Sequence, residues 1–139
     1  MAADPDCIFC KIVAGQVPSF KLCEDAETLA FMDINPVHDG HCLVIPKAHY
    51  PTVFDIAPEA FAAVARVTAR VAAAVNAALQ SDGLNLIQAN GKGAAQSVGH
   101  FHMHVLPRHL GDGLLVNWTP KPGDMAHIAE VAARIRAHL

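Results

Sequence analysis

Residues 100–107 read His-Phe-His-Met-His-Val-Leu-Pro, and the alternation of histidines with apolar residues in this stretch is the strongest indication of the fold. Successive side chains of a β-strand point to opposite faces, so a strand over Gly99–Pro107 places three imidazoles on one face. Phe101, Met103 and Val105 then point the other way, into a hydrophobic core. The pattern predicts a half-buried strand whose other face is crowded with titratable rings.

Three neighbouring histidines are unusual on a solvent-facing strand, where Thr, Lys or Glu would serve equally well. Two kinds of chemistry are open to them. Three imidazoles are able to hold zinc in an open catalytic site. Alternatively, one imidazole acts as a nucleophile while its neighbours donate hydrogen bonds to a phosphoryl group. The alternation by itself does not choose between these two.

The flanking sequence predicts an α+β fold around a mainly antiparallel sheet, in a single domain spanning residues 1–139. Strands come first, followed by one long helix, two strands and a final helix, without regular βαβ repetition. The predicted elements are a helical turn at Ile8–Ala14, strands at Ser19–Glu24, Thr28–Met32 and His41–Ile45, a helix from Pro58 to about Gln80, strands at Leu84–Ala89 and Gly99–Pro107, and a helix at Gly123–Leu139 that closes the domain.

Composition narrows the classes of function. The 139 residues include 10 Lys and Arg against 13 Asp and Glu, so the chain lacks the positive field of a nucleic-acid binder. The most apolar stretch, Ala57–Leu79, is interrupted by Arg66 and Arg70 and predicts an amphipathic helix rather than a membrane span. The acidic start, Met1–Asp6, is unlike a secretion signal, so we expect a cytoplasmic protein whose cysteines are thiols or metal ligands.

Further motifs surround the three histidines. They are Ile8-Phe9-Cys10-Lys11-Ile12, Leu29-Ala30-Phe31-Met32-Asp33-Ile34-Asn35-Pro36, His41-Cys42-Leu43-Val44-Ile45-Pro46-Lys47 and Gln96-Ser97-Val98. In order and spacing, these motifs and the three histidines resemble the histidine triad family of nucleotide hydrolases and transferases. The resemblance is close from about Cys7 to Arg108 and looser beyond.

This resemblance implies a homodimer of α+β protomers, each with a five-stranded antiparallel sheet and a nucleotide cleft beside the histidines. In such proteins the middle histidine, here His102, attacks the α-phosphorus, and water hydrolyses the resulting nucleotidyl-histidine. The implied substrates are small nucleotides, such as nucleoside phosphoramidates or dinucleoside polyphosphates. His104 and His41 match positions that contact phosphate oxygens or orient the nucleophile. The transferase branch typically has glutamine at the position of His104, so histidine there favours hydrolysis.

The resemblance also implies roles for other residues of the cleft. Ser97 and Gln96 match the family's phosphate and leaving-group contacts, and Asn90 matches a polar residue that lines the cleft. Asp33 matches the carboxylate that accepts hydrogen bonds from both ribose hydroxyls. Five apolar positions match the base pocket, although each suits an ordinary core equally well: Ile8, Phe9, Ile12, Phe31 and Ile34.

Many bacterial members of the family carry a Cys-x-x-Cys pair that holds zinc together with two histidines. The matching residues here are Cys7, Cys10, His49 and His100. A Cys2His2 set is closed and tetrahedral, which is typical of a structural zinc site. With His100 engaged by zinc, His102 is left free for chemistry.

Two other functions stay open on the sequence. One is a metallohydrolase in which His100, His102 and His104 all bind zinc, although no additional acidic ligand motif accompanies them. The other is a nucleotide-binding or scaffolding protein in which hydrolysis is vestigial, because catalytic residues alone do not establish a biological role.

Overall fold

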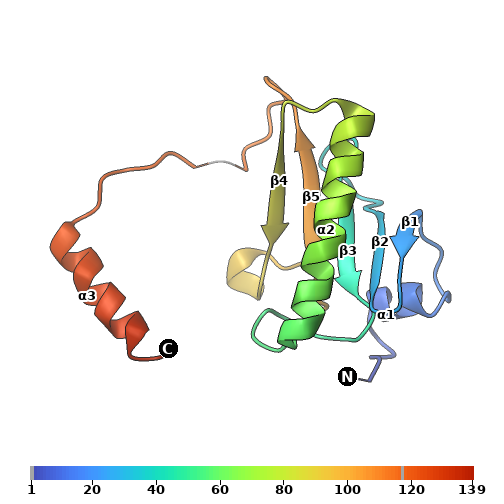
Figure 1. The fold of residues 1–139 in the computed structure, drawn as a ribbon, viewed down its shortest axis with the longest axis horizontal. Helices are drawn as coiled ribbons and strands as arrows, with labels where there is room; N and C mark the ends of the chain where they lie inside the picture. The colour runs from blue at the N-terminus through green and yellow to red at the C-terminus, as the bar shows by residue number, and fades with distance from the viewer. Residues whose placement is uncertain (1, 117) are drawn as a thin grey trace.

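The structure, a computed structural model, describes residues 2–116 and 118–139. Five strands form one antiparallel sheet in the order β1-β2-β3-β5-β4, which confirms the predicted fold class (Figure 1). Most element ends lie within two residues of their predicted positions. The elements are α1 (Ile8–Val13), β1 (Lys21–Glu24), β2 (Thr28–Met32), β3 (Cys42–Pro46), α2 (Pro58–Leu79), β4 (Gly83–Gln88), the 3-10 turn η1 (Lys92–Ala94), β5 (Met103–Arg108) and α3 (Met125–Arg136).

The central strands are buried on both faces, so their side chains alternate between two apolar clusters. α2 covers one face, where Val64 and Val67 cluster with Val44 of β3. α1 lies against the other face, where Phe9 meets Phe31 edge to face. Polar side chains on the α1 side of β5 therefore lie next to α1.

The helix α2 is long and apolar enough, by length and composition alone, to cross a membrane. In the structure it lies along the sheet and buries one stripe of side chains: Ala63, Val64, Val67, Thr68 and Val71. Pro58 occupies its first turn, where a missing N–H breaks no helical hydrogen bond. One buried stripe is what the amphipathic pattern of residues 57–79 predicted.

The strand that carries the histidines is shorter than predicted, because β5 begins at Met103 and not at Gly99. β3 ends at Pro46, which has no N–H to continue the ladder, and the Phe101 amide donates instead to the Tyr50 carbonyl. Side-chain alternation nevertheless continues before the strand. Phe101 is fully buried in the α2-side cluster, whereas the rings of residues 100 and 102 contact Phe9 of α1 on the other side.

The last helix does not close the domain, contrary to the sequence prediction. α3 begins at Met125, where Asp124 caps its first turn, and none of its residues is buried. Figure 1 shows α3 standing apart from the body, on the side of β4. We call residues 109–139 the C-terminal arm.

Candidate active site and metal centre

A cavity of about 420 Å³ opens on the α1 side of the sheet. It brings together Ile8, Phe9, Ile12, Phe31, Asp33, Ile34, Ser97, His102 and His104, all of which the sequence placed at the site. Asn35 and Val98 also line it and were not predicted as site residues. Both residues lie in the sequence motifs quoted above, directly next to predicted site residues. This adjacency is the sequence signal that could have identified them.

His102 is the most enclosed polar group of this cavity, with 2% of its surface exposed. Its Nδ1 lies 2.7 Å from the carbonyl oxygen of His100, and because that oxygen only accepts, Nδ1 carries the ring proton. The lone pair is therefore on Nε2. Burial lowers the pKa of His102, so the ring is neutral at neutral pH. A neutral imidazole with a free nitrogen is the form that acts as a nucleophile.

His41 sets the tautomer of His104. The backbone N–H of Val37 donates to Nδ1 of His41 at 3.2 Å, which leaves the proton of His41 on Nε2. That Nε2 lies 2.8 Å from Nδ1 of His104 and donates to it, so His104 carries its own proton on Nε2. Burial lowers the pKa of His41, and it lowers the pKa of His104 to about 4. Both rings are neutral at neutral pH.

Two adjacent imidazoles thus offer opposite functions to one cavity. The ring centroids of His102 and His104 are 4.8 Å apart. His102 offers a lone pair, and His104 offers an N–H. This pairs a nucleophile with a donor for developing negative charge. His41 lies behind His104 and outside the cavity lining, so it is a positioning residue.

Asp33, directly after β2, adds the negative charge of the site. One of its oxygens accepts the backbone N–H of Asn35 at 2.8 Å, and its Oδ2 lies 3.5 Å from Nε2 of His41. The carboxylate acts on the pKa of His41 and of His102 in the upward direction, against the larger effect of burial. Asp33 therefore both faces the cavity and lies beside the imidazole chain.

The structure does not bring Asn90 and Gln96 into the cavity lining. The side-chain oxygen of Asn90 accepts the backbone N–H of Val53 at 2.7 Å. The side-chain nitrogen of Gln96 donates to the Pro51 carbonyl at 2.7 Å, and its oxygen accepts an amide N–H within its own loop. In this conformation both side chains brace the loop that presents Ser97.

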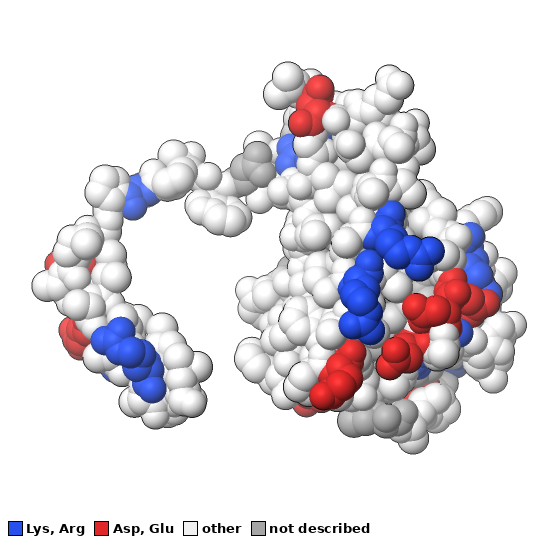
Figure 2. Space-filling model, in the orientation of Figure 1, with Lys and Arg blue, Asp and Glu red and all other residues white. Residues whose placement is uncertain are grey.

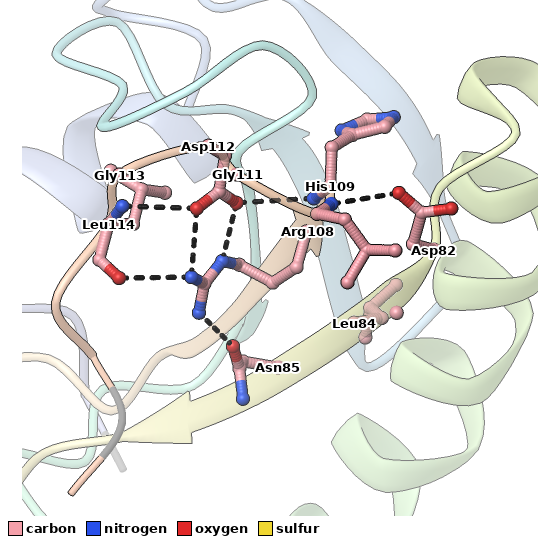
Figure 3. A pocket seen from close by; sticks show the side chains of 11 residues that line it. Asp82, Leu84, Asn85, Arg108, His109, Gly111, Asp112, Gly113 and Leu114 are labelled. Carbon is pink, nitrogen blue, oxygen red and sulfur yellow. Dashed lines mark hydrogen bonds and ion pairs between the residues drawn. The ribbon is translucent and has the colours of Figure 1, made fainter.

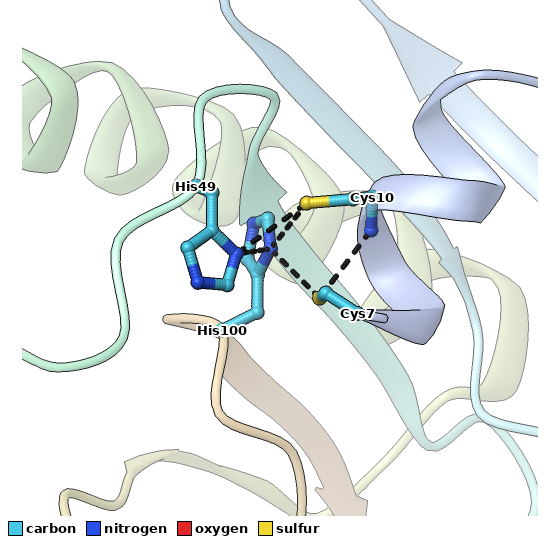
Figure 4. Close-up of side chains that lie close together, drawn as sticks. All are labelled: Cys7, Cys10, His49 and His100. Carbon is cyan, nitrogen blue, oxygen red and sulfur yellow. Dashed lines mark hydrogen bonds between the residues drawn. The ribbon is translucent and has the colours of Figure 1, made fainter. Parts of the chain in front are cut away.

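Four metal-ligating side chains converge beside this cavity (Figure 4). They are Cys7, Cys10, His49 and His100, with ligand atoms within 4.8 Å of one another. The two Nδ1 atoms are 3.2 Å apart, and Sγ of Cys10 is 3.4 Å from Nδ1 of His49. A tetrahedral zinc with Zn–N bonds of about 2.0–2.1 Å and Zn–S bonds of about 2.3 Å needs ligand separations of roughly 3.3–3.8 Å. The observed distances are close to that range.

A hydrogen bond outside this cluster turns the lone pair of His100 inward. Nε2 of His100 donates to the Pro46 carbonyl at 2.8 Å, so its Nδ1 is unprotonated, and burial lowers its pKa to about 4. Nε2 of His49 lies 3.9 Å from the carboxylate of Asp4, a neighbour the sequence did not reveal. Two imidazole nitrogens and two thiols that meet at one point form a donor set that fits zinc, and the Pro46 carbonyl orients the ring of His100.

The same geometry is inconsistent with zinc held by the three neighbouring histidines. Nδ1 of His100 faces the thiol of Cys7, whereas Nδ1 of His102 is bound to a backbone carbonyl. Within the described residues, no metal-ligating group contains more than one of His100, His102 and His104. The geometry therefore speaks against a metallohydrolase in which these three histidines share one zinc.

A second hollow, of about 470 Å³, lies at the other end of β4 and β5 (Figure 3). Arg108 there forms a two-pronged ion pair with Asp112, at 2.7 and 2.9 Å, and donates to Asn85 at 2.9 Å. Hydrogen bonding to Arg108 holds the pKa of Asp112 well below its usual range. Because the two charges satisfy each other, they anchor the start of the C-terminal arm rather than offer a binding site.

Comparison with known proteins places this geometry in context. The HIT domain matches residues 14–111. "Protein hit" of Bacillus subtilis is 41% identical over 135 residues, which are 93% of each chain. "Adenosine 5'-monophosphoramidase HNT1" of Saccharomyces cerevisiae is 38% identical over 137 residues, 98% of this chain and 84% of that protein. "Adenylylsulfatase HINT3" of Arabidopsis thaliana is 42% identical over 109 residues, 78% of this chain and 55% of that protein.

Solved structures share the fold. The chain of SMU.412c from Streptococcus mutans superposes with a TM-score of 0.94 at 36% identity, over 99% of this chain and 88% of that one. A superposition of that quality includes the C-terminal arm, which is about a fifth of the residues. A zinc-bound histidine triad family protein from Mycobacterium smegmatis has a TM-score of 0.76 at 38% identity, over 96% of this chain and 98% of that one. By sequence and by fold, this chain belongs to the HIT domain family.

Proposed function

We propose that this chain is a nucleotidyl hydrolase that cleaves the bond between the α-phosphorus and the leaving group of a nucleoside phosphoramidate or a dinucleoside polyphosphate. The observation that carries the proposal is the lone pair of His102 beside the N–H of His104 at one cavity. Relatives named as an adenosine monophosphoramidase and an adenylylsulfatase support the broader class of nucleotide hydrolase.

The proposed reaction has two steps. In the first, Nε2 of His102 bonds to phosphorus while the bond to the leaving group breaks, and the leaving group takes a proton from solvent. In the second, water bonds to phosphorus, gives up a proton to solvent and displaces His102, releasing a nucleoside monophosphate. In both steps Nε2–H of His104 donates to the phosphate oxygen that gains negative charge.

The rest of the cavity suits a nucleoside. Oδ2 of Asp33 accepts from the ribose hydroxyls, and Phe9 and Phe31 provide apolar surface for the base. Ser97 is exposed on its loop and faces the leaving group. Asn90 and Gln96 support this loop from outside the cavity.

We also propose one structural zinc on Cys7, Cys10, His49 and His100. The donor set and its distances support it, as does the zinc-bound relative. Cys7 is the N-cap of α1, so a metal there ties the start of α1 to the sheet. This keeps Phe9 edge to face on His102, with ring centroids 5.3 Å apart. In this proposal the zinc has a structural role only, and the imidazoles of His102 and His104 carry out the reaction. The cytoplasmic location expected from the sequence stays a prediction.

Turnover by the wild type, His102→Ala and His138→Ala tests the function. His138 is an exposed histidine on the arm and controls for loss of an imidazole. With a panel of adenosine phosphoramidates and dinucleotides, we expect His102→Ala to lose at least about a thousandfold in kcat and His138→Ala to keep full activity. Alkaline quench of substrate labelled at the α-phosphorus should trap label on the wild type only. Full turnover by folded His102→Ala contradicts the mechanism, and tight binding without turnover by the wild type favours the scaffold alternative.

A further inference from the structure

An apolar groove lies between α2 and the first two strands, on the face of the sheet opposite the active-site cavity. It has a volume of about 510 Å³, which is within the usual range for a small-molecule site. Its lining includes Leu22, Cys23, Met32, Val75 and Ala78. In Figure 1, β1 and β4 lie on opposite sides of α2, so the groove faces away from β4 and from the C-terminal arm. No described part of the protomer fills it.

The groove is apolar along its length and carries a charge at one end. The α2 residues of its lining run from Arg70 to Leu79, and the lining residues between these two are all Val or Ala. At 1.5 Å per residue, this stretch of helix is roughly 14 Å long. In the same view as Figure 1, Figure 2 shows positive side chains over α2 and uncharged surface beside its upper half. The groove is therefore an apolar channel with a cation near its entrance.

The charge of Arg70 is available to a ligand. Its side chain is exposed, and no ion pair between described residues includes it. Among the described residues, no Asp or Glu lines the groove. A guanidinium offers two parallel N–H donors that match the two oxygens of a carboxylate. The groove therefore favours an occupant with a negative head and an apolar tail.

The end of the groove away from Arg70 is closed. Gly40 has a φ of +85°, and a Cβ at that position would overlap Cδ1 of Leu79. The last turn of α2 thus lies directly on the backbone that precedes β3. A tail that enters beside Arg70 meets this contact after the length of the α2 stretch. An extended dodecanoate tail is of similar length.

We propose that this groove binds one long-chain carboxylate, such as dodecanoate, with its carboxylate at Arg70 and its tail along α2 toward Gly40. The guanidinium donates two hydrogen bonds to the carboxylate oxygens. The tail covers apolar side chains that water otherwise contacts, among them Leu22, which is 46% exposed. The closed end admits a single monomeric chain rather than a lipid surface. The affinity therefore depends both on the charge of the head and on the length of the tail.

Calorimetric titration of the full-length chain with dodecanoate, below its micelle concentration, tests the proposal. We expect one saturable site per chain, and we expect hexanoate, with the same charge and a shorter tail, to bind at least about tenfold more weakly. Arg70→Gln should weaken dodecanoate binding about three- to tenfold. Arg66→Gln is the matched control, because Arg66 is an exposed arginine one turn earlier that does not line the groove, and it should change binding less than about twofold. No saturable binding, or equal effects of the two arginine variants, overturns the proposal.

A second measurement locates the tail. Cys23 is partly exposed and lines the groove, so a bound tail should shield its thiol from a maleimide. At a dodecanoate concentration ten times the dissociation constant, labelling of Cys23, followed by peptide mass spectrometry, should slow about tenfold. Ala74→Phe fills the groove and should abolish this protection, whereas Ala69→Phe, on α2 outside the lining, should keep it.

Melting curves establish that both phenylalanine variants are folded. Equal protection in the two variants shows that the tail lies elsewhere and overturns the proposal. A Cys23 thiol that is unreactive before dodecanoate is added shows that another segment of the chain, or a second copy, already fills the groove. That result overturns the proposal as well.

Discussion

Replacing His41 with leucine isolates the hydrogen-bond chain that sets the tautomer of His104. Leucine removes both the acceptor for the Val37 N–H and the donor to Nδ1 of His104, while it fills a similar volume. His104 is then free to carry its proton on Nδ1. In that tautomer it turns a lone pair, instead of an N–H, toward the phosphate oxygen.

The size of the effect follows from the bond that is lost. A buried hydrogen bond between neutral groups has a net worth of about 0.5–1.5 kcal/mol. Losing that bias toward the productive tautomer lowers kcat about 2- to 12-fold. Deleting the donor with His104→Ala removes charge stabilisation itself, which costs about 100- to 1000-fold at comparable sites. KM should change little in His41→Leu, because its contact with substrate is indirect.

A double-mutant cycle separates this mechanism from a direct role of His41. Because His41 acts through His104, the double variant should be no slower than His104→Ala alone. The measurement is kcat and KM for the four proteins, with melting curves to establish that each is folded. If the two effects multiply in the double variant, His41 acts independently of His104 and the reasoning is refuted.

Two further predictions concern the metal and pH. The purified wild type should hold about one zinc per chain, whereas Cys10→Ser should hold far less and melt several degrees lower. Cys23→Ser, outside the cluster, should keep its zinc; an equal melting temperature with and without metal would count against a structural role. Folding lowers the pKa of His104 from 6.5 to about 4, so the fold favours the neutral ring. Its contribution to the free energy of unfolding is complete above pH 6.5 and is lost as pH falls toward 4, by at most about 3 kcal/mol. Urea unfolding of the wild type and His104→Gln across this range measures the difference, because the other groups of the site are the same in both proteins; identical pH dependence contradicts the prediction.

Some of the site could be predicted because it depends on local geometry. Side-chain direction alternates along extended backbone whatever the rest of the fold does, so residues 100–105 were enough to place three imidazoles on one face. The same locality explains the buried stripe of α2 and the close match of most element ends. The start of β5 was predicted four residues too early, because Pro46, on another strand, interrupts the ladder.

Other parts of the site depend on neighbours far away in the sequence. The proton positions in the imidazole chain follow from the Val37 amide and the His100 carbonyl, and only the folded backbone brings those groups to the rings. The side chains of Asn90 and Gln96 likewise point away from the cavity because they form hydrogen bonds with the backbone of Val53 and Pro51. No periodicity in the sequence encodes such contacts.

The sequence by itself determined the α+β class and the shared face of the histidines, because strand alternation follows from the order of residues along the chain, while the Cys2His2 set came from the resemblance to the family. Only the tertiary structure decided which nitrogen of each imidazole is free and that α3 leaves its own body. Periodicity establishes that a helix has an apolar face, but the surface that covers this face is set by packing between segments distant in sequence.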